Sequence, residues 1–235
     1  MPRREKVRIV QIVVVSSPGT GATPHWSHEV AADFAHQAVA RGATVRWLVA
    51  LHAGQPIPPG GPGLQVFAHK DRKVLALNKV AASQLDVPLE VTLTECLRAE
   101  PLSAVVHIGV GGQGTPNVLW LADRLGSPTF ACVHGAELVC HRGDLLDRDK
   151  RICKDWMDPE RCRRCCSIKL FGNPSSNDLR NRADLFIAGF HACVSISVPT
   201  ERDVSLVTDL GVAENQIAIG ASAEDLISRV FAEVD

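Results

Sequence analysis

The feature that most constrains the fold is the apolar run VRIVQIVVV at residues 7–15, which is continuous and rich in β-branched side chains. Such runs are typical of central strands in parallel sheets, which are buried on both faces. A turn of small residues, SSPGTGA, follows. Residues 27–41 then have helical periodicity and end at Gly42, and residues 44–51 are again strand-like. This order predicts a β-α-β unit.

The same alternation continues along the chain. We expect further strands at residues 64–68, 87–93, 104–109, 129–134, 183–188, 194–197 and 217–219, and further helices at 71–84, 115–125, 179–182, 199–210 and 222–234. Strands that alternate with helices predict an α/β fold with a doubly wound, mostly parallel, Rossmann-like sheet and helices on both faces. We expect residues 1–235 to form a single domain, with a loop-rich cysteine insertion at about 135–177.

Composition narrows the class of protein. Hydrophobic residues make up 46% of the chain and there is no tyrosine, so the core must be mainly aliphatic. The 25 basic and 26 acidic residues leave a net charge of −1, which argues against nucleic acid as a partner. We find neither a secretory signal nor a run of about 20 apolar residues that could form a transmembrane segment. We therefore expect a cytoplasmic protein, in which thiols stay reduced.

Candidate binding residues follow several of the expected strands. Gly19 and Gly21 lie between the first strand and first helix, where backbone N–H groups and the helix dipole favour anions. His107 and His134 each end a strand, and Glu137 follows the second of them. Ligands of open α/β sheets bind beyond the carboxyl ends of the strands, so these residues are candidates for contacts with phosphates or sugar hydroxyls. A tight turn, structural histidines and a solvated loop charge are the alternative interpretations.

A cluster of cysteines is the sharpest motif. Cys140, Cys153, Cys162 and Cys165 follow the pattern C-x12-C-x8-C-x2-C, with Cys166 adjacent to the last. Four thiols in one polar segment match the soft, tetrahedral coordination of zinc, so we expect a structural Zn site and no redox cofactor. Nearby arginines would stabilise the thiolates. Reduced cysteines without a metal, or a single disulfide, are the alternatives.

Several segments resemble family-4 retaining glycosyltransferases, whose GT-B arrangement has two Rossmann-like domains. The first strand and glycine turn resemble the opening of these enzymes, and AVVHI at 104–108 with LWLADRLGSP at 119–128 resembles their next strand-helix unit. The most specific similarity is HGAELVCHRG at 134–143 with DPERCRRCC at 158–166. These residues resemble the HD…CPRG…C…PxRCxxC segment of a four-cysteine subset of the family.

The resemblance implies a nucleotide-sugar donor, a sugar acceptor and specific roles for residues. Gly19 and Gly21 would approach the phosphates of the donor. His134 would be the catalytic residue that faces the reaction centre, and Glu137 and Arg142 would lie on the acceptor side. His107 remains a candidate for donor or acceptor binding at its own strand end.

The sequence also departs from the family. Gly135 replaces the aspartate that follows the strand-end histidine, and the sequence contains no Glu-x7-Glu pair of the donor-binding domain. We therefore expect the acceptor-side domain of a glycosyltransferase that needs a separate donor-binding domain, either on a possible partner subunit or in a part of the protein that this sequence omits. The alternatives are a non-catalytic glycan- or protein-binding domain, and a generic nucleotide-binding α/β protein.

Overall fold

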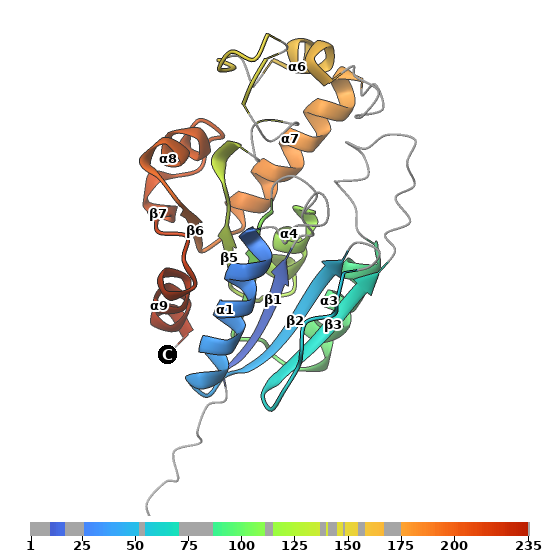
Figure 1. The fold of residues 1–235 in the computed structure, drawn as a ribbon, viewed down its shortest axis with the longest axis vertical. Coiled ribbons are helices and arrows are strands. Elements are labelled where there is room, and N and C mark those ends of the chain that lie inside the picture. Colours follow the sequence, from blue (N-terminus) through green and yellow to red (C-terminus); the bar gives the residue numbers. More distant parts are fainter. Residues whose placement is uncertain are drawn as a thin grey trace, which may run out of the picture.

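A seven-stranded parallel sheet forms the centre of the protein, in the order β3-β2-β1-β4-β5-β6-β7 (Figure 1). The computed structural model describes residues 10–16, 26–51, 55–70, 87–110, 115–136, 140, 145–147, 149–154, 158–166 and 175–234. The strands are β1 (Gln11–Ser16), β2 (Thr44–Leu51), β3 (Leu64–Lys70), β4 (Ala104–Ile108), β5 (Thr129–Cys132), β6 (Ser195–Val198) and β7 (Ile217–Ile219). The strand order reverses between β1 and β4, as in doubly wound folds. The predicted fold class is confirmed.

Helices cover both faces of the sheet (Figure 1). They are α1 (Trp26–Ala40), α3 (Val87–Ala99), α4 (Asn117–Arg124), α6 (Pro159–Cys166), α7 (Ser176–His191), α8 (Glu201–Thr208) and α9 (Ala223–Val234). Val14 of β1 belongs to the core shared with α1 and α9, whereas the preceding Val13 belongs to the core shared with α3 and α4. Both side chains are fully buried, which explains why the first strand is apolar at consecutive positions.

The prediction of a strand at residues 87–93 is wrong, because this segment begins helix α3. Leu89, Leu93 and Cys96 are buried at helical spacing, and Pro88 occupies the first turn, where its missing N–H is not needed. Two β-branched valines made the segment strand-like, but packing against the sheet follows the helical period. The helix expected at residues 71–84 lies outside the described residues.

The prediction of a strand at residues 183–188 is also wrong, because α7 runs through it. The helix begins with a capping box in which the Ser175 hydroxyl accepts a hydrogen bond from the Asp178 backbone N–H. Phe186 and Phe190 are buried four residues apart on the face that packs against the sheet. The strong start signal and the buried period override the strand-like composition of this segment.

The described part of the cysteine-rich segment lies beside α7. It contains α6 and an antiparallel bridge between Leu146 and Ile152. Figure 1 shows α6 next to the amino-terminal end of α7, beyond the carboxyl ends of the strands. None of the helices in the described ranges has the length and hydropathy needed to cross a membrane.

Candidate functional site

His134 lies at the carboxyl edge of the sheet, two residues after β5 ends. Its ring contacts the indole of Trp26, the first residue of α1, with ring centroids 4.1 Å apart and the planes tilted by 56°. Both side chains are partly exposed. The amino terminus of α1 and the loop after β5 therefore form one aromatic pair at the edge where open α/β sheets bind ligands.

A second aromatic contact continues this edge. The His28 ring lies 5.0 Å from the Trp47 ring of β2, and the Trp47 indole N–H donates a 2.9 Å hydrogen bond to the hydroxyl of Ser16, the last residue of β1. Burial lowers the pKa of His28, against the opposing effect of the Glu29 carboxylate. The imidazole of His28 is therefore mainly neutral at neutral pH, so it can donate one hydrogen bond and accept another.

Asp203 fixes the backbone next to His134. The Gly135 N–H donates to Asp203 Oδ1 at 2.9 Å, and the Thr200 hydroxyl donates to Asp203 Oδ2 at 2.6 Å. A Cβ atom at position 135 would lie 2.6 Å from Asp203 Oδ1, so the carboxylate occupies the space of a side chain. Asp203 thus joins the first turn of α8 to the loop that carries His134.

His107 occupies a different place from His134. It is fully buried in β4, in register with Val15 of β1 and Ala131 of β5. Because side chains alternate along a strand, His107 shares the face of Val105, which packs against α3 and α4. His134 instead contacts Trp26 at the start of α1. The structure therefore brings the two histidines to neighbouring strand ends but to opposite faces.

Sequence reasoning missed Trp26, His28 and Asp203. Trp26 and His28 lie at the start of the helix that comes after the glycine turn. This position could have identified them as candidate site residues. The only sequence feature of Asp203 was its position near the start of an expected helix, three residues after Thr200. Of the predicted residues, Gly19, Gly21, Glu137 and Arg142 lie outside the described residues.

The cysteine segment folds into a short hairpin that faces α6. The Cys153 N–H donates to the Leu145 carbonyl at 2.7 Å, beside the bridge between Leu146 and Ile152. The Cys165 thiol of α6 approaches the Leu146 carbonyl at 3.9 Å. Cys153 and Cys165 therefore contact adjacent residues of the hairpin, Leu145 and Leu146.

Cys162 is the thiol at the centre of this group. Burial raises its pKa to about 12, and the nearby thiols of Cys166, Cys140, Cys153 and Cys165 add to the increase. All eight cysteines of the chain are free thiols. Among the described residues, no three His, Cys, Asp or Glu side chains are grouped so as to hold a metal ion. The predicted zinc site therefore stays a prediction.

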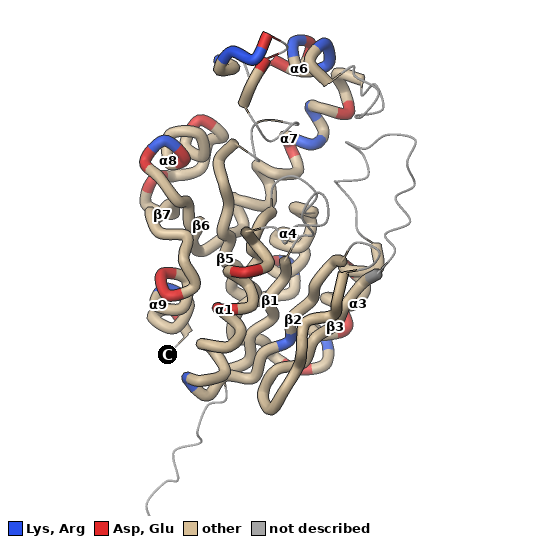
Figure 2. Tube along the Cα trace, in the orientation of Figure 1, with Lys and Arg blue, Asp and Glu red and all other residues tan. Residues whose placement is uncertain are grey.

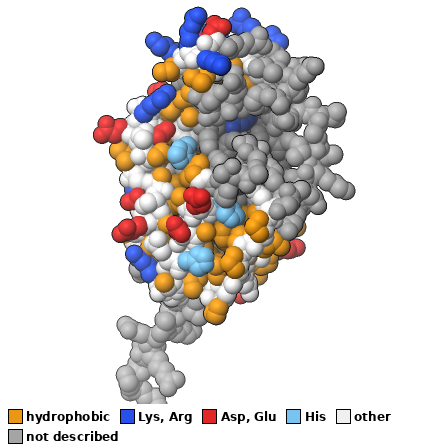
Figure 3. All heavy atoms as spheres, in the orientation of Figure 1, with side chains coloured by type: hydrophobic (Ala, Val, Ile, Leu, Met, Phe, Trp, Pro, Cys, Tyr) orange, Lys and Arg blue, Asp and Glu red, His pale blue; other side chains and the backbone are white. Residues whose placement is uncertain are grey.

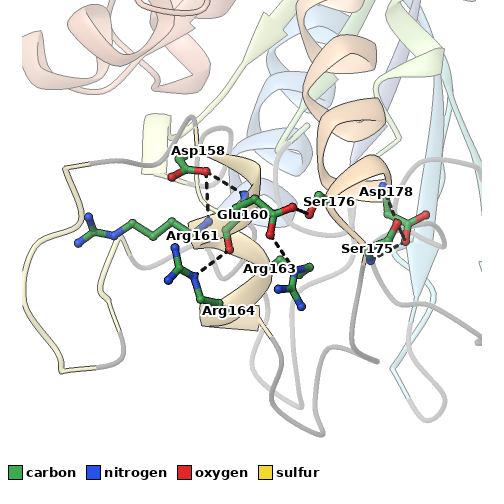
Figure 4. A network of polar contacts seen from close by, with 8 residues as sticks. All are labelled: Asp158, Glu160, Arg161, Arg163, Arg164, Ser175, Ser176 and Asp178. Atoms are coloured by element: carbon green, nitrogen blue, oxygen red, sulfur yellow. Dashed lines mark hydrogen bonds and ion pairs between the residues drawn. The ribbon is translucent and has the colours of Figure 1, made fainter.

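Polar contacts fix α6 to α7 (Figure 4). Asp158 Oδ1 accepts hydrogen bonds from the N–H groups of Glu160 and Arg161 at the start of α6. The Glu160 carboxylate accepts hydrogen bonds from the Ser176 hydroxyl and from Arg163 Nε, and these bonds lower the pKa of Glu160. Ser176 is the first residue of α7, so the two helices are joined at their polar ends.

Basic side chains gather at this end of the molecule. Figure 2 shows Lys and Arg along α6 and the adjacent segment, and Figure 3 shows them exposed on the surface there. The exposed basic residues of these segments are Lys150, Arg151, Lys154, Arg161, Arg163 and Arg164. The positive charge therefore surrounds the thiol group rather than the His134 edge.

No protein-family model matches the sequence, and no curated protein is significantly similar to it. Among solved structures, UGT2 of Phytolacca americana, complexed with UDP-2-fluoro-glucose and pterostilbene, is 15% identical with a TM-score of 0.51, and the match covers 92% of this chain and 53% of that one. UDP-GlcNAc 2-epimerase of Methanocaldococcus jannaschii is 10% identical with a TM-score of 0.43, and the match covers 89% of this chain and 45% of that one. Anabaena Alr3699/HepE, complexed with UDP and glucose, is 11% identical with a TM-score of 0.42, and the match covers 89% and 43%.

The chain spans about half the length of the solved structures that it matches. The similarity to UGT2 extends over nearly all of this chain, and at 15% identity it concerns the fold. This chain therefore has the fold of one Rossmann-like domain of a GT-B glycosyltransferase.

Proposed function

We propose that this chain is the acceptor-side domain of a glycosyltransferase that transfers a sugar from a nucleotide-sugar donor. A donor-binding domain outside these residues, in the same protein or on a partner subunit, would complete the enzyme. The observation that carries the proposal is the Trp26–His134 pair at the carboxyl edge of a GT-B sheet. The complex of UGT2 with a UDP-sugar and pterostilbene supports it, because this chain corresponds to about half of that protein.

In this proposal His134 contacts the transferring sugar. A partly exposed imidazole can donate to or accept from a sugar hydroxyl, and the Trp26 ring supplies an apolar wall beside it. The diphosphate of the donor would provide binding energy that positions the anomeric carbon. We also propose that Gly19 and Gly21 approach the phosphates of the donor and that Glu137 and Arg142 lie on the acceptor side.

We assign the domain to the family-4 retaining enzymes with the four-cysteine segment, on the basis of the motifs at residues 134–143 and 158–166. A cytoplasmic location belongs to the same proposal.

One observation favours the alternative, a non-catalytic glycan- or protein-binding domain. The family has aspartate after the strand-end histidine, and this chain has Gly135. Asp203 occupies the space that a side chain at this position would need. An aspartate at position 135 is therefore incompatible with the observed packing of α8, so any catalytic contribution from that position is lost.

Calorimetry on the isolated chain tests the proposal. We expect weak binding of UDP- and GDP-sugars by the chain alone, measurable binding of a glycan acceptor, and loss of acceptor binding in His134→Ala. His36→Ala is the matched control, because His36 is exposed on α1 and its Nδ1 is hydrogen-bonded to the Ala32 carbonyl of the same helix.

The outcomes separate the hypotheses. Tight binding of a nucleotide-sugar by the chain alone would refute the acceptor-side assignment in favour of a nucleotide-binding protein. Co-purification of a partner with its own Rossmann-like domain, and sugar transfer by the pair, would support the enzymatic proposal. Glycan or protein binding without such a partner would support the non-catalytic alternative.

A further inference from the structure

We propose that Cys140, Cys153, Cys162 and Cys165 bind one zinc ion that fastens the hairpin around Leu145 to α6, and that Cys166 is not a ligand. The proposal is independent of the glycosyltransferase assignment. It rests on the spacing of the four thiols in the sequence and on the contacts that place Cys153 and Cys165 beside the adjacent residues Leu145 and Leu146.

The first of these contacts lies in the hairpin. Cys153 is hydrogen-bonded through its N–H to the Leu145 carbonyl, which places its backbone opposite that residue. Leu145 is buried in the core beneath α7, and Cys140 packs against the same core. Cys153 is therefore bonded to a residue of the core against which Cys140 also packs.

Helix α6 supplies the other two thiols. Cys162 and Cys165 are three residues apart, so their side chains lie on the same face of the helix. The Cys165 thiol approaches the Leu146 carbonyl, which shows that this face is turned toward the hairpin.

The choice between Cys165 and Cys166 follows from their positions. Cys165 is partly exposed and points to the hairpin, whereas Cys166 is only 2% exposed at the end of α6. A zinc ion shared with Cys153 must lie on the hairpin side of the helix. Cys165 therefore completes the set and Cys166 serves as a buried apolar residue.

The chemistry of the donors fits zinc. Four thiols that lose their protons provide a tetrahedral site with Zn–S distances of about 2.3 Å, and the protons pass to solvent. Because no three donors among the described residues are yet grouped around one point, the thiols must rotate inward as the ion binds. Arg161, Arg163 and Arg164 on α6 would offset the net negative charge of a four-thiolate site.

The zinc ion would attach α6 to the hairpin, in addition to the polar contacts that attach α6 to α7. Glu160 and Ser176 already join α6 to α7, and the Cys165 thiol contacts the Leu146 carbonyl of the hairpin. Four metal–sulfur bonds would make hairpin and helix one rigid unit beside the amino terminus of α7. Metal sites of this kind contribute directly to folding free energy.

Metal analysis of the full chain, purified without chelators, tests the proposal. We expect one zinc per chain in the unmodified protein and in Cys166→Ser, and nearly complete loss of zinc in Cys162→Ser. Replacement by Co²⁺ should produce the absorption bands of tetrahedral cobalt thiolate in the unmodified protein. Absence of stoichiometric metal, or equal loss in Cys166→Ser and Cys162→Ser, would overturn the proposal.

A measurement on the unmodified protein guards against variants that fail to fold. Chelation should increase amide hydrogen exchange in the hairpin and α6 while β1, β2 and β4 stay protected. Unchanged exchange after the metal has been removed would contradict the fastening role. A disulfide among these cysteines in protein kept under reducing conditions, detected by mass spectrometry, would overturn the ligand set.

Discussion

Replacing Gly135 by alanine should destabilise the protein through one defined collision. The added Cβ would lie 2.6 Å from Asp203 Oδ1 and 3.1 Å from the Asp203 Cα. The first atom can move with its side chain, but the second belongs to the backbone of α8. Gly135 is not among the glycines with positive φ, so the effect is one of space and not of backbone conformation.

The magnitude follows from the contacts that must change. Moving the carboxylate breaks its hydrogen bond to the Gly135 N–H, and such bonds to charged groups contribute about 1.5–3 kcal/mol. Overpacking at a buried position costs about 1–3 kcal/mol, and the two effects overlap because the hydrogen bond is broken to relieve the collision. We expect Gly135→Ala to lower the free energy of unfolding by about 2–4 kcal/mol.

A double-mutant cycle isolates the collision. Asp203→Ala alone removes the hydrogen bond and part of the α8 cap, so it should also destabilise. In that background the Oδ1 collision is gone, and Gly135→Ala should cost less, with a coupling on the order of 1–2 kcal/mol. The remaining contact with the α8 backbone prevents complete rescue.

Urea unfolding with linear extrapolation measures the free energy of unfolding of the unmodified protein, the two single variants and the double variant. Gly61→Ala is the matched control, because nothing lies within 4 Å of a Cβ at that position. We expect its unfolding free energy to stay close to that of the unmodified protein. The reasoning would be refuted if Gly135→Ala were as harmless as Gly61→Ala, or if it cost the same with and without Asp203.

Three further predictions follow from individual contacts. Trp47→Phe should lower the free energy of unfolding by about 1–3 kcal/mol, measured by urea unfolding, because it leaves the buried Ser16 hydroxyl without its donor; an unchanged value would contradict this. Because the pKa of Glu160 is lowered, its hydrogen bonds stabilise α6 fully above the ordinary glutamate pKa and are lost as the pH falls through the lowered pKa. The amide hydrogen exchange of α6, corrected for intrinsic rates, should therefore rise at acidic pH. This rise should be smaller in Glu160→Gln. Burial raises the pKa of Cys193 to about 12, so mass spectrometry after alkylation should find this thiol unmodified in the native protein and labelled after unfolding in urea; early labelling of the native protein would contradict its burial.

Helix and strand assignments from the sequence succeeded where composition and periodicity agreed. The run at residues 7–15 and the segment at 104–109 predicted parallel strands, and the helices expected at residues 199–210 and 222–234 are α8 and α9. The strands expected at residues 87–93 and 183–188 became parts of α3 and α7. A short apolar run is compatible with either a helix or a strand. Only its packing against the sheet determines whether residues at helical or at strand spacing are buried.

The residues of the candidate site were likewise predicted only in part from the sequence. Local sequence was sufficient to place His134 at a strand end, because a buried strand followed by a polar residue is visible within a few positions. It could not identify Trp26 as the partner of His134 or Asp203 as the partner of Gly135, since the latter two are 68 residues apart. Nor could it show that His107 lies on the opposite face, because that depends on the register of β4 between β1 and β5.

The sequence by itself therefore determined the class of fold, the central strand and the spacing of the thiols, since each depends on neighbours along the chain. Tertiary structure decided which residues share the carboxyl edge of the sheet. Those contacts arise when the parallel crossovers bring the start of α1, the end of β5 and the start of α8 together. No local pattern encodes the distance between such segments, because it is set by the packing of the whole sheet.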